Sequence, residues 1–308
     1  MELHACLPAE LAGATITRIA AGLSGAGVYR VEAAGASYVL KVAADAEPIA
    51  AWRRRAEVYQ LAAAAGLAPR VIHVDEAHRA ITSAFVADRS LFALLGDPRT
   101  RAGAIDQLGA TLRRVHDLPL PEGAEPRDLR ALLGQVWSSV AAIATPSFVG
   151  EAVAGALAEV APPSERALVL SHNDVNPSNL IHDGERVLLL DWDAAGPADP
   201  LFDLAALALF LRLDRPSCAA LIAAHDGAPP AALPQRFGYF RRLIAVAVGV
   251  MFLHLARASG HAGASDDPGG TLADCHRRMR TRALDLATPD GRWAYGLALI
   301  RESSTPIP

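Results

Sequence analysis

The 308-residue chain has a formal net charge of -4, and 52% of its residues are hydrophobic. This is the composition of an ordinary globular protein, and it excludes both disorder and the basic footprint that nucleic-acid binding needs. Three widely spaced cysteines without a CxxC pair favour a reducing compartment, and the apolar run at residues 243–253 is too short to span a bilayer. No export signal is evident. We therefore expect a cytoplasmic protein with no membrane span and a small-molecule partner, while the oligomeric state stays open.

The first ninety residues are rich in short β-forming runs. A helix is predicted at residues 48–65, where strong helix formers follow an early proline and precede Gly66. The runs that predict strands are residues 14–20, 27–33 and 37–43, and a pair within 70–87 around a polar turn at 75–78. Residues 1–87 are therefore expected to form a first domain, an antiparallel five-stranded sheet with one helix.

From residue 88 onward the sequence is mostly helical. One face of a helix is marked by apolar residues at helical spacing, namely Ile105, Leu108, Leu112 and Val115. An island of strand interrupts the helices at residues 167–193, where Asp183-Gly184 is a strong hairpin signal. We expect residues 88–308 to form a helical second domain that carries this hairpin and an acceptor-substrate pocket.

The chain's only asparagines, Asn173, Asn176 and Asn179, lie within seven positions in the stretch SHNDVNPSNL. Asp174 lies among them on the loop that enters the hairpin, and Asp191 ends the returning strand, so the turn should bring Asn179 beside Asp191. Oxygen ligands from two segments suit Mg²⁺. Asp and Asn in loops are usually turn formers and caps, but this combination predicts a metal-phosphate site with Asp174 facing a substrate hydroxyl.

The run at residues 171–205 contains H-x-D-x-x-x-x-N, a strand ending in Asp191 and then Trp192, and a DP-x-x-DLA segment at residues 199–205. This combination resembles the aminoglycoside phosphotransferase and choline kinase superfamily. The resemblance implies an α+β, bilobal protein-kinase-like fold, in which a small N-lobe with a five-stranded antiparallel sheet and one helix precedes a larger, mainly helical C-lobe. It implies ATP and Mg²⁺ as cofactors, Asp174 as the catalytic residue, and Asn179 and Asp191 as metal ligands. We expect His172 to be structural.

The same resemblance implies a lysine on the third strand, held by a glutamate on the following helix and touching the α- and β-phosphates of ATP. Lys41 lies on the third expected strand and is the only lysine among the 29 basic residues. An ammonium kept in a background of arginines indicates a position where a guanidinium does not fit. Glu57 lies on the 48–65 helix as its expected partner, although a solvated carboxylate beside Arg53 to Arg55 is the simpler alternative.

Two further segments are expected to contact the nucleotide. Ser24, Gly25 and Gly27 occupy the place of the phosphate-covering loop, but an arginine replaces the third glycine of G-x-G-x-x-G, so a plain turn remains open. Backbone groups of Ala84 and Val86 are expected to bind adenine at the hinge between the lobes. A P-loop is excluded because the lone lysine is not followed by Ser or Thr.

These features predict a kinase that transfers the ATP γ-phosphate to a hydroxyl of a small acceptor. A cationic acceptor of the aminoglycoside or choline type would suit the acidic residues that follow the hairpin and cluster late, although each is more simply a cap or a surface charge; they are Asp193, Asp199, Asp203, Asp266, Asp267 and Asp274. Aromatic residues of a late helix could cage a quaternary ammonium or form ordinary core; they are Phe237, Tyr239, Phe240 and Phe252. Alternatives are a nucleotide-binding regulatory pseudokinase and, with less support, a protein kinase, because no long activation segment follows Asp191.

Overall fold

The computed structural model describes residues 2–19, 26–44 and 47–308, and the chain divides into two compact units. The first unit consists of Met1–Glu125, Val169–Pro197 and Ala223–Ala228. The second consists of Pro126–Leu168, Ala198–Ile222 and Pro229–Pro308. The boundary expected after residue 87 separates a nucleotide-binding part of the chain from an acceptor-binding part. This division by function stays a prediction.

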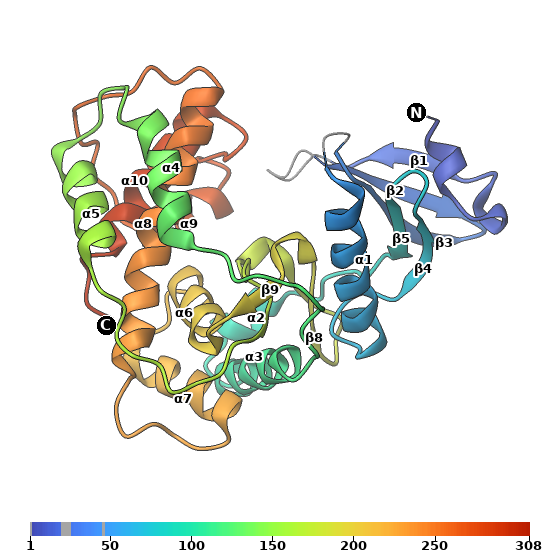
Figure 1. The fold of residues 1–308 in the computed structure, drawn as a ribbon, viewed down its shortest axis with the longest axis horizontal. Helices are drawn as coiled ribbons and strands as arrows, with labels where there is room; N and C mark the ends of the chain where they lie inside the picture. Colours follow the sequence, from blue (N-terminus) through green and yellow to red (C-terminus); the bar gives the residue numbers. More distant parts are fainter. Residues whose placement is uncertain (1, 20–25, 45–46) are drawn as a thin grey trace. The chain divides into compact units, whose positions relative to one another are not determined.

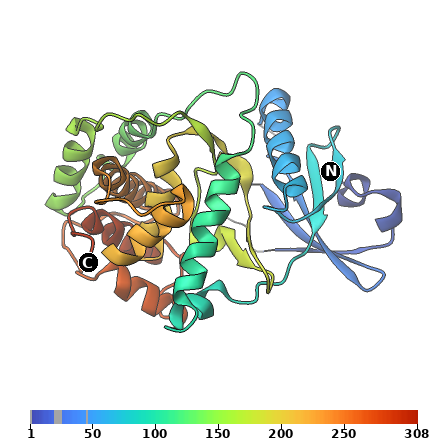
Figure 2. The same ribbon diagram turned by 90° about the horizontal axis from the view of Figure 1, so that it is seen from below.

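The first unit opens with a five-stranded antiparallel sheet of strand order β1-β2-β3-β5-β4, which confirms the predicted sheet (Figure 1). Its strands are β1 (Thr15–Arg18), β2 (Gly27–Ala33), β3 (Ala36–Val42), β4 (Val71–Asp75) and β5 (Ala80–Ala84). Helix α1 (Ile49–Ala64) follows β3 and lies along the sheet (Figure 2). Strands β2 and β3 are joined by a tight turn, in which Ala34 and Gly35 both have positive φ.

The alternation of side chains along β3 decides where the lone lysine lies. Leu40 and Val42 are buried in a cluster with the 3-10 helices η1 (Leu3–Cys6) and η2 (Ala9–Leu11) on one face of the sheet. Because successive side chains of a strand point to opposite faces, Lys41 faces the other side. That side is covered by α1, whose Trp52 packs on Ile81, the register partner of Lys41.

The remainder of the first unit supports a small hairpin. Its elements are α2 (Leu91–Gly96), α3 (Arg101–His116), β6 (Val169–Ser171), η3 (Pro177–Asn179), β7 (Leu180–His182), β8 (Val187–Leu189), η4 (Trp192–Ala194) and the start of β9 (Gly196–Ala198). The predicted apolar face of α3 is buried and packs towards β6 and β8. Strands β7 and β8 pair with Leu180 opposite Leu189, and Gly184 adopts the positive φ that the predicted turn requires.

The second unit is helical and is organised around α8 (Gln235–Ala258), which packs against α4, α6 and α10. The other helices are α4 (Leu129–Val140), α5 (Ser147–Ala158), α6 (Pro200–Phe210), α7 (Arg215–Asp226, of which the part up to Ile222 belongs to this unit), α9 (Leu272–Arg280) and α10 (Pro289–Glu302). By length and composition α8 could cross a membrane, which the shorter run considered in the sequence did not suggest. Within the structure 61% of its most apolar window is buried, as in the central helix of a protein core.

Helices α8 and α10 cross where both carry glycine. A Cβ added at Gly249 would lie 2.8 Å from the carbonyl oxygen of Gly296 and 2.5 Å from Cγ1 of Ile300, so the two backbones approach too closely for a side chain. We expect Gly249→Ala to lower the free energy of unfolding by about 1–3 kcal/mol, because the helices must move apart. Urea unfolding measures the change.

Gly238, on the same helix, is the matched control. A Cβ there would meet only the flexible tip of Arg242, at 3.3 Å. Because alanine is the better helix former by about 1 kcal/mol, Gly238→Ala should leave stability unchanged or raise it slightly. Equal losses in the two variants would contradict the close crossing.

Candidate active site

The hairpin brings the predicted metal ligands together. The carbonyl oxygen of Asn179 accepts a hydrogen bond from the backbone N–H of Leu190 at 2.8 Å, so Asn179 lies beside the end of the returning strand and close to Asp191. Asp191 itself has φ 58° and ψ 68°, a left-handed conformation that non-glycine residues seldom adopt. The next residue, Trp192, is 2% exposed and donates from Nε1 to the carbonyl of Leu189, which anchors the turn.

Two of the asparagines hold the carboxylate of Asp174. Asn176 Nδ2 donates to Asp174 Oδ1 at 2.9 Å, and Asn179 Nδ2 donates to Asp174 Oδ2 at 2.8 Å and to its carbonyl oxygen at 3.0 Å. Burial raises the pKa of Asp174 and the charge of Asp191 adds to the rise, while the amide hydrogen bonds oppose it. The structure therefore fixes both oxygens of this carboxylate in one orientation.

Asn173 and His172 anchor the loop to the segment around Asp191. Asn173 has φ 61°, and its Nδ2 donates to the carbonyl oxygens of Ala194 and Gly196 at 3.1 and 3.2 Å. The buried His172 ring packs edge-on against Trp192 with centroids 4.8 Å apart, and its Nε2 lies 2.9 Å from the carbonyl of Leu190. His172 thus has the structural role expected of it, and Asn173 ties the loop to the segment after Asp191.

Lys41 reaches the same place from β3. Its Nζ lies 2.7 Å from Oδ1 of Asp191 and 2.7 Å from Oδ2 of Asp193, so one ammonium is shared by two carboxylates. Burial alone would raise the pKa of Asp193, but the positive charges of Lys41 and Arg55 outweigh it and lower that pKa. The structure thus unites Lys41, Asp174, Asn179 and Asp191, four of the residues singled out from the sequence.

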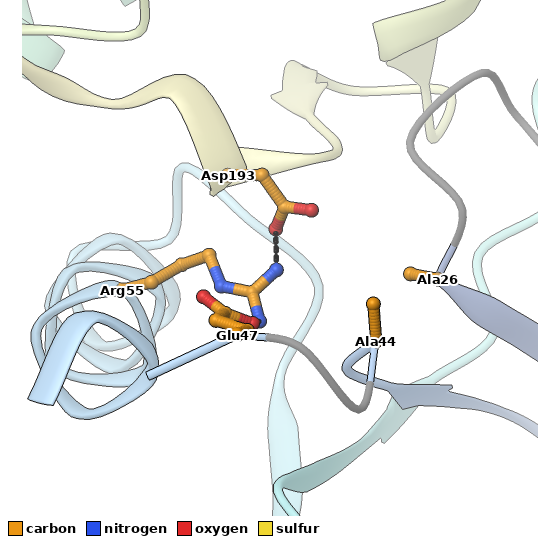
Figure 3. A pocket seen from close by; sticks show the side chains of 5 residues that line it. All are labelled: Ala26, Ala44, Glu47, Arg55 and Asp193. Carbon is orange, nitrogen blue, oxygen red and sulfur yellow. Dashed lines mark hydrogen bonds and ion pairs between the residues drawn. The ribbon is translucent and has the colours of Figure 1, made fainter. Parts of the chain in front are cut away.

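Glu57 does not join them. It is exposed, and it is not an ion-pair partner of Lys41 in the described part of the chain. Arg55 lies there instead (Figure 3). Its Nη1 is 2.6 Å from Asp193 Oδ1, and its Nη2 is 2.6 Å from Glu47 Oε2. At about 100° per residue, Arg55 falls inside the arc of buried α1 residues, which includes Trp52, and Glu57 falls opposite. A helical wheel would have found Arg55 from the sequence.

The other expected nucleotide contacts divide into three cases. Ser24 and Gly25 lie outside the described residues. Gly27 begins β2, where an added Cβ would meet the Tyr29 ring at 2.8 Å, so its small size has a packing reason. At the expected hinge the N–H of Ala84 already donates to the carbonyl of Arg70 at 2.8 Å, while Val86 lies just beyond β5.

Several acidic residues considered for a cationic acceptor have structural partners in the second unit. Asp199 caps α6 through the N–H of Leu201 and pairs with Arg236 at 2.6 Å. Asp274 forms a capping box with Thr271 at the start of α9. Among the aromatic residues, Phe237 and Tyr239 are buried and Phe240 packs against the core. Caps and core account for these residues without an acceptor.

The donor set beside Asp174 fits a magnesium ion. Asn179 uses its amide nitrogen for Asp174, which leaves the amide oxygen as the ligand atom, and Asp191 offers a carboxylate. One neutral and one charged oxygen are ligands that Mg²⁺ accepts while it keeps other positions for water and phosphate.

The sheet with its helix, the asparagine-rich loop and the hairpin together define a protein of the protein-kinase-like fold. More particularly, the chain belongs to the phosphotransferase enzyme family, whose model matches residues 15–239, more than half of the sequence. This confirms the resemblance to the aminoglycoside phosphotransferase and choline kinase superfamily. No curated protein matches the chain.

Several solved structures have this fold. A choline/ethanolamine kinase family protein from Mesorhizobium loti is 21% identical with a TM-score of 0.63, covering 98% of this chain and 93% of its own. Choline kinase LicA from Streptococcus pneumoniae is 12% identical with a TM-score of 0.63, covering 94% and 93%. An aminoglycoside-3'-phosphotransferase of type VIII is 24% identical with a TM-score of 0.55, covering 75% and 93%.

Replacing the lone lysine tests whether the site is fitted to an ammonium. In Lys41→Arg a wider, planar head must fit between two carboxylates that each lie 2.7 Å from Nζ. Because misplacement by about 1 Å costs on the order of 10²-fold, we expect kcat/KM for ATP to fall by that amount. Steady-state kinetics with varied ATP measures it, and the reverse exchange at exposed Arg54, Arg54→Lys, is the control. Full activity of Lys41→Arg would contradict the fitted site.

Proposed function

We propose that this protein is an ATP-dependent small-molecule kinase that transfers the γ-phosphate of ATP to a hydroxyl of its acceptor. The observation that carries the proposal is the carboxylate of Asp174, held by Asn176 and Asn179 on the loop that ends at Asn179, one of the two proposed metal ligands. Family membership supports a phosphotransferase, and the solved complex of LicA with AMP supports a nucleotide as its partner.

Each residue has one task in the proposed reaction. Asp174 accepts a hydrogen bond from the acceptor hydroxyl, which aligns it, and takes its proton as the new P–O bond forms and the bond to the ADP oxygen breaks. Lys41 binds the α- and β-phosphates. Asn179 and Asp191 would hold Mg²⁺, which neutralises phosphate charge. Residues 1–87 act as the nucleotide-binding lobe, with Ser24, Gly25 and Gly27 covering phosphate, and residues 88–308 as the acceptor lobe.

The acceptor is proposed as a class only: a small molecule with a free hydroxyl, of the aminoglycoside or choline type. The kinases with this fold include proteins named for choline, ethanolamine and spectinomycin. No observation favours the regulatory pseudokinase or the protein kinase. A cytoplasmic location is part of the proposal, because ATP is available there and Cys6, Cys218 and Cys275 are all free thiols.

A panel assay tests the proposal. The protein is incubated with ATP and Mg²⁺ and with amino alcohols, sugars and aminoglycosides one at a time, and ADP release is followed. We expect acceptor-dependent ADP release with at least one class and its loss when EDTA removes the metal. Binding of ATP without ADP release for any compound of the panel would overturn the proposal and favour a regulatory pseudokinase.

Removing the proposed base gives a second test. Asp174→Ala should lower kcat by about 10²–10⁴-fold, because the acceptor hydroxyl loses both its orientation and its proton acceptor. The fold should survive, since the residue lies on a loop outside the core clusters of the described chain. Asp106→Ala, at an exposed position of α3, is the matched control for loss of a carboxylate. Retained activity in Asp174→Ala would remove this residue from the mechanism.

A further inference from the structure

Helix α1 contributes a cation, not an anion, to the charged centre around Lys41. Arg55 is 15% exposed and lies on the buried arc of the helix, while Glu57 faces solvent. Removing a charged guanidinium from water costs free energy unless the group is paired with an anion. It has two pairs, one with Asp193 and one with Glu47, both at 2.6 Å.

These ion pairs form one chain of five charges. It runs from Glu47 through Arg55 to Asp193, and from Asp193 through Lys41 to Asp191. Asp193 is the link, because one of its oxygens meets Arg55 and the other meets Lys41. The chain joins α1, β3 and the segment after β8, and the contact between α1 and η4 brings the helix to Asp193.

Arg55 also lines a hollow in the protein surface. A hollow of about 260 Å³ is lined by Ala26, Ala44, Glu47, Arg55 and Asp193 (Figure 3). Ala26 directly precedes β2 and Ala44 lies two residues beyond the end of β3, the strand that carries Lys41. The charge chain therefore lies beside a hollow at the proposed phosphate end of the nucleotide site.

We propose that Asp193 takes the role expected of a helix glutamate, and that Arg55 and Asp193 act as positioning residues for Lys41. Asp193 supplies the second carboxylate that fixes the ammonium, and Arg55, fixed in turn by Glu47, holds Asp193 in place. Without Arg55, Asp193 would be free to turn, and Lys41 would be drawn to Asp191, the proposed metal ligand. This inference rests on the proposed function, because Lys41, the residue that Arg55 and Asp193 position, is itself proposed to bind ATP.

Kinetics of matched variants tests the role of Arg55. In Arg55→Gln we expect kcat/KM for ATP to fall by about 10–10²-fold, with KM for the acceptor unchanged, because only the phosphate-binding side is disturbed. Arg55→Lys keeps a cation near Asp193 and should recover most of the loss, and Asp193→Asn should lose as much as Arg55→Gln. Arg54→Gln, the exposed neighbour on the same helix, should match the unaltered protein. Equal activity of Arg55→Gln and Arg54→Gln would overturn the inference, as would a loss confined to Glu57→Gln.

A measurement without turnover separates this inference from the proposed function. Because Lys41 is the only lysine, protein made with lysine labelled with ¹³C at Cε alone gives one side-chain NMR signal. That signal should shift in Arg55→Gln and Asp193→Asn and stay in place in Arg54→Gln. An unshifted signal in folded Arg55→Gln overturns the positioning role, whatever the enzyme does. A shifted signal in a protein that phosphorylates no acceptor supports the ion-pair chain while the proposed function fails.

Discussion

Lys41 Nζ lies 2.7 Å from a carboxylate oxygen of Asp191 and 2.7 Å from one of Asp193, so a strand of the sheet and the segment after the hairpin share one ammonium. Two carboxylates this close would repel each other without the cation between them. The sheet positions the cation through strand alternation, and the hairpin positions the anions through the left-handed turn at Asp191. The rest of the site is arranged around this contact.

The loop before the hairpin solves a related problem of charge. Asp174 lies close enough to Asp191 for that charge to raise its pKa, so further carboxylates here would be costly. Asparagine supplies N–H donors without adding charge. Asn173 donates to two backbone carbonyls, and Asn176 and Asn179 donate to the oxygens of Asp174.

Local patterns predicted much of this architecture. The Asp183-Gly184 turn fixed the register that sets Asn179 beside Asp191, because a hairpin with a short turn has few alternatives. The predicted Lys41–Glu57 pair shows where such patterns fail. Distance along the chain selected Glu57, but a helix presents its residues by angle, and the buried arc that includes Trp52 selects Arg55. The sequence suggested for Asp193 only a role in binding a cationic acceptor. Its contact with Lys41 could not be predicted, because that contact depends on how η4 packs against α1, which no local pattern encodes.

The confinement of asparagine to this loop has a consequence for how the protein ages. Spontaneous hydrolysis of an asparagine side chain replaces an N–H donor with a carboxylate. In this chain it can happen at only three positions, all on the loop that carries Asp174. At Asn179 the product would set a new negative charge 2.8 Å from an oxygen of Asp174, and at Asn173 it would lose both bonds to the segment after Asp191. Hydrolysis of asparagine would therefore alter the proposed active site, while the rest of the chain has no asparagine that could react in this way.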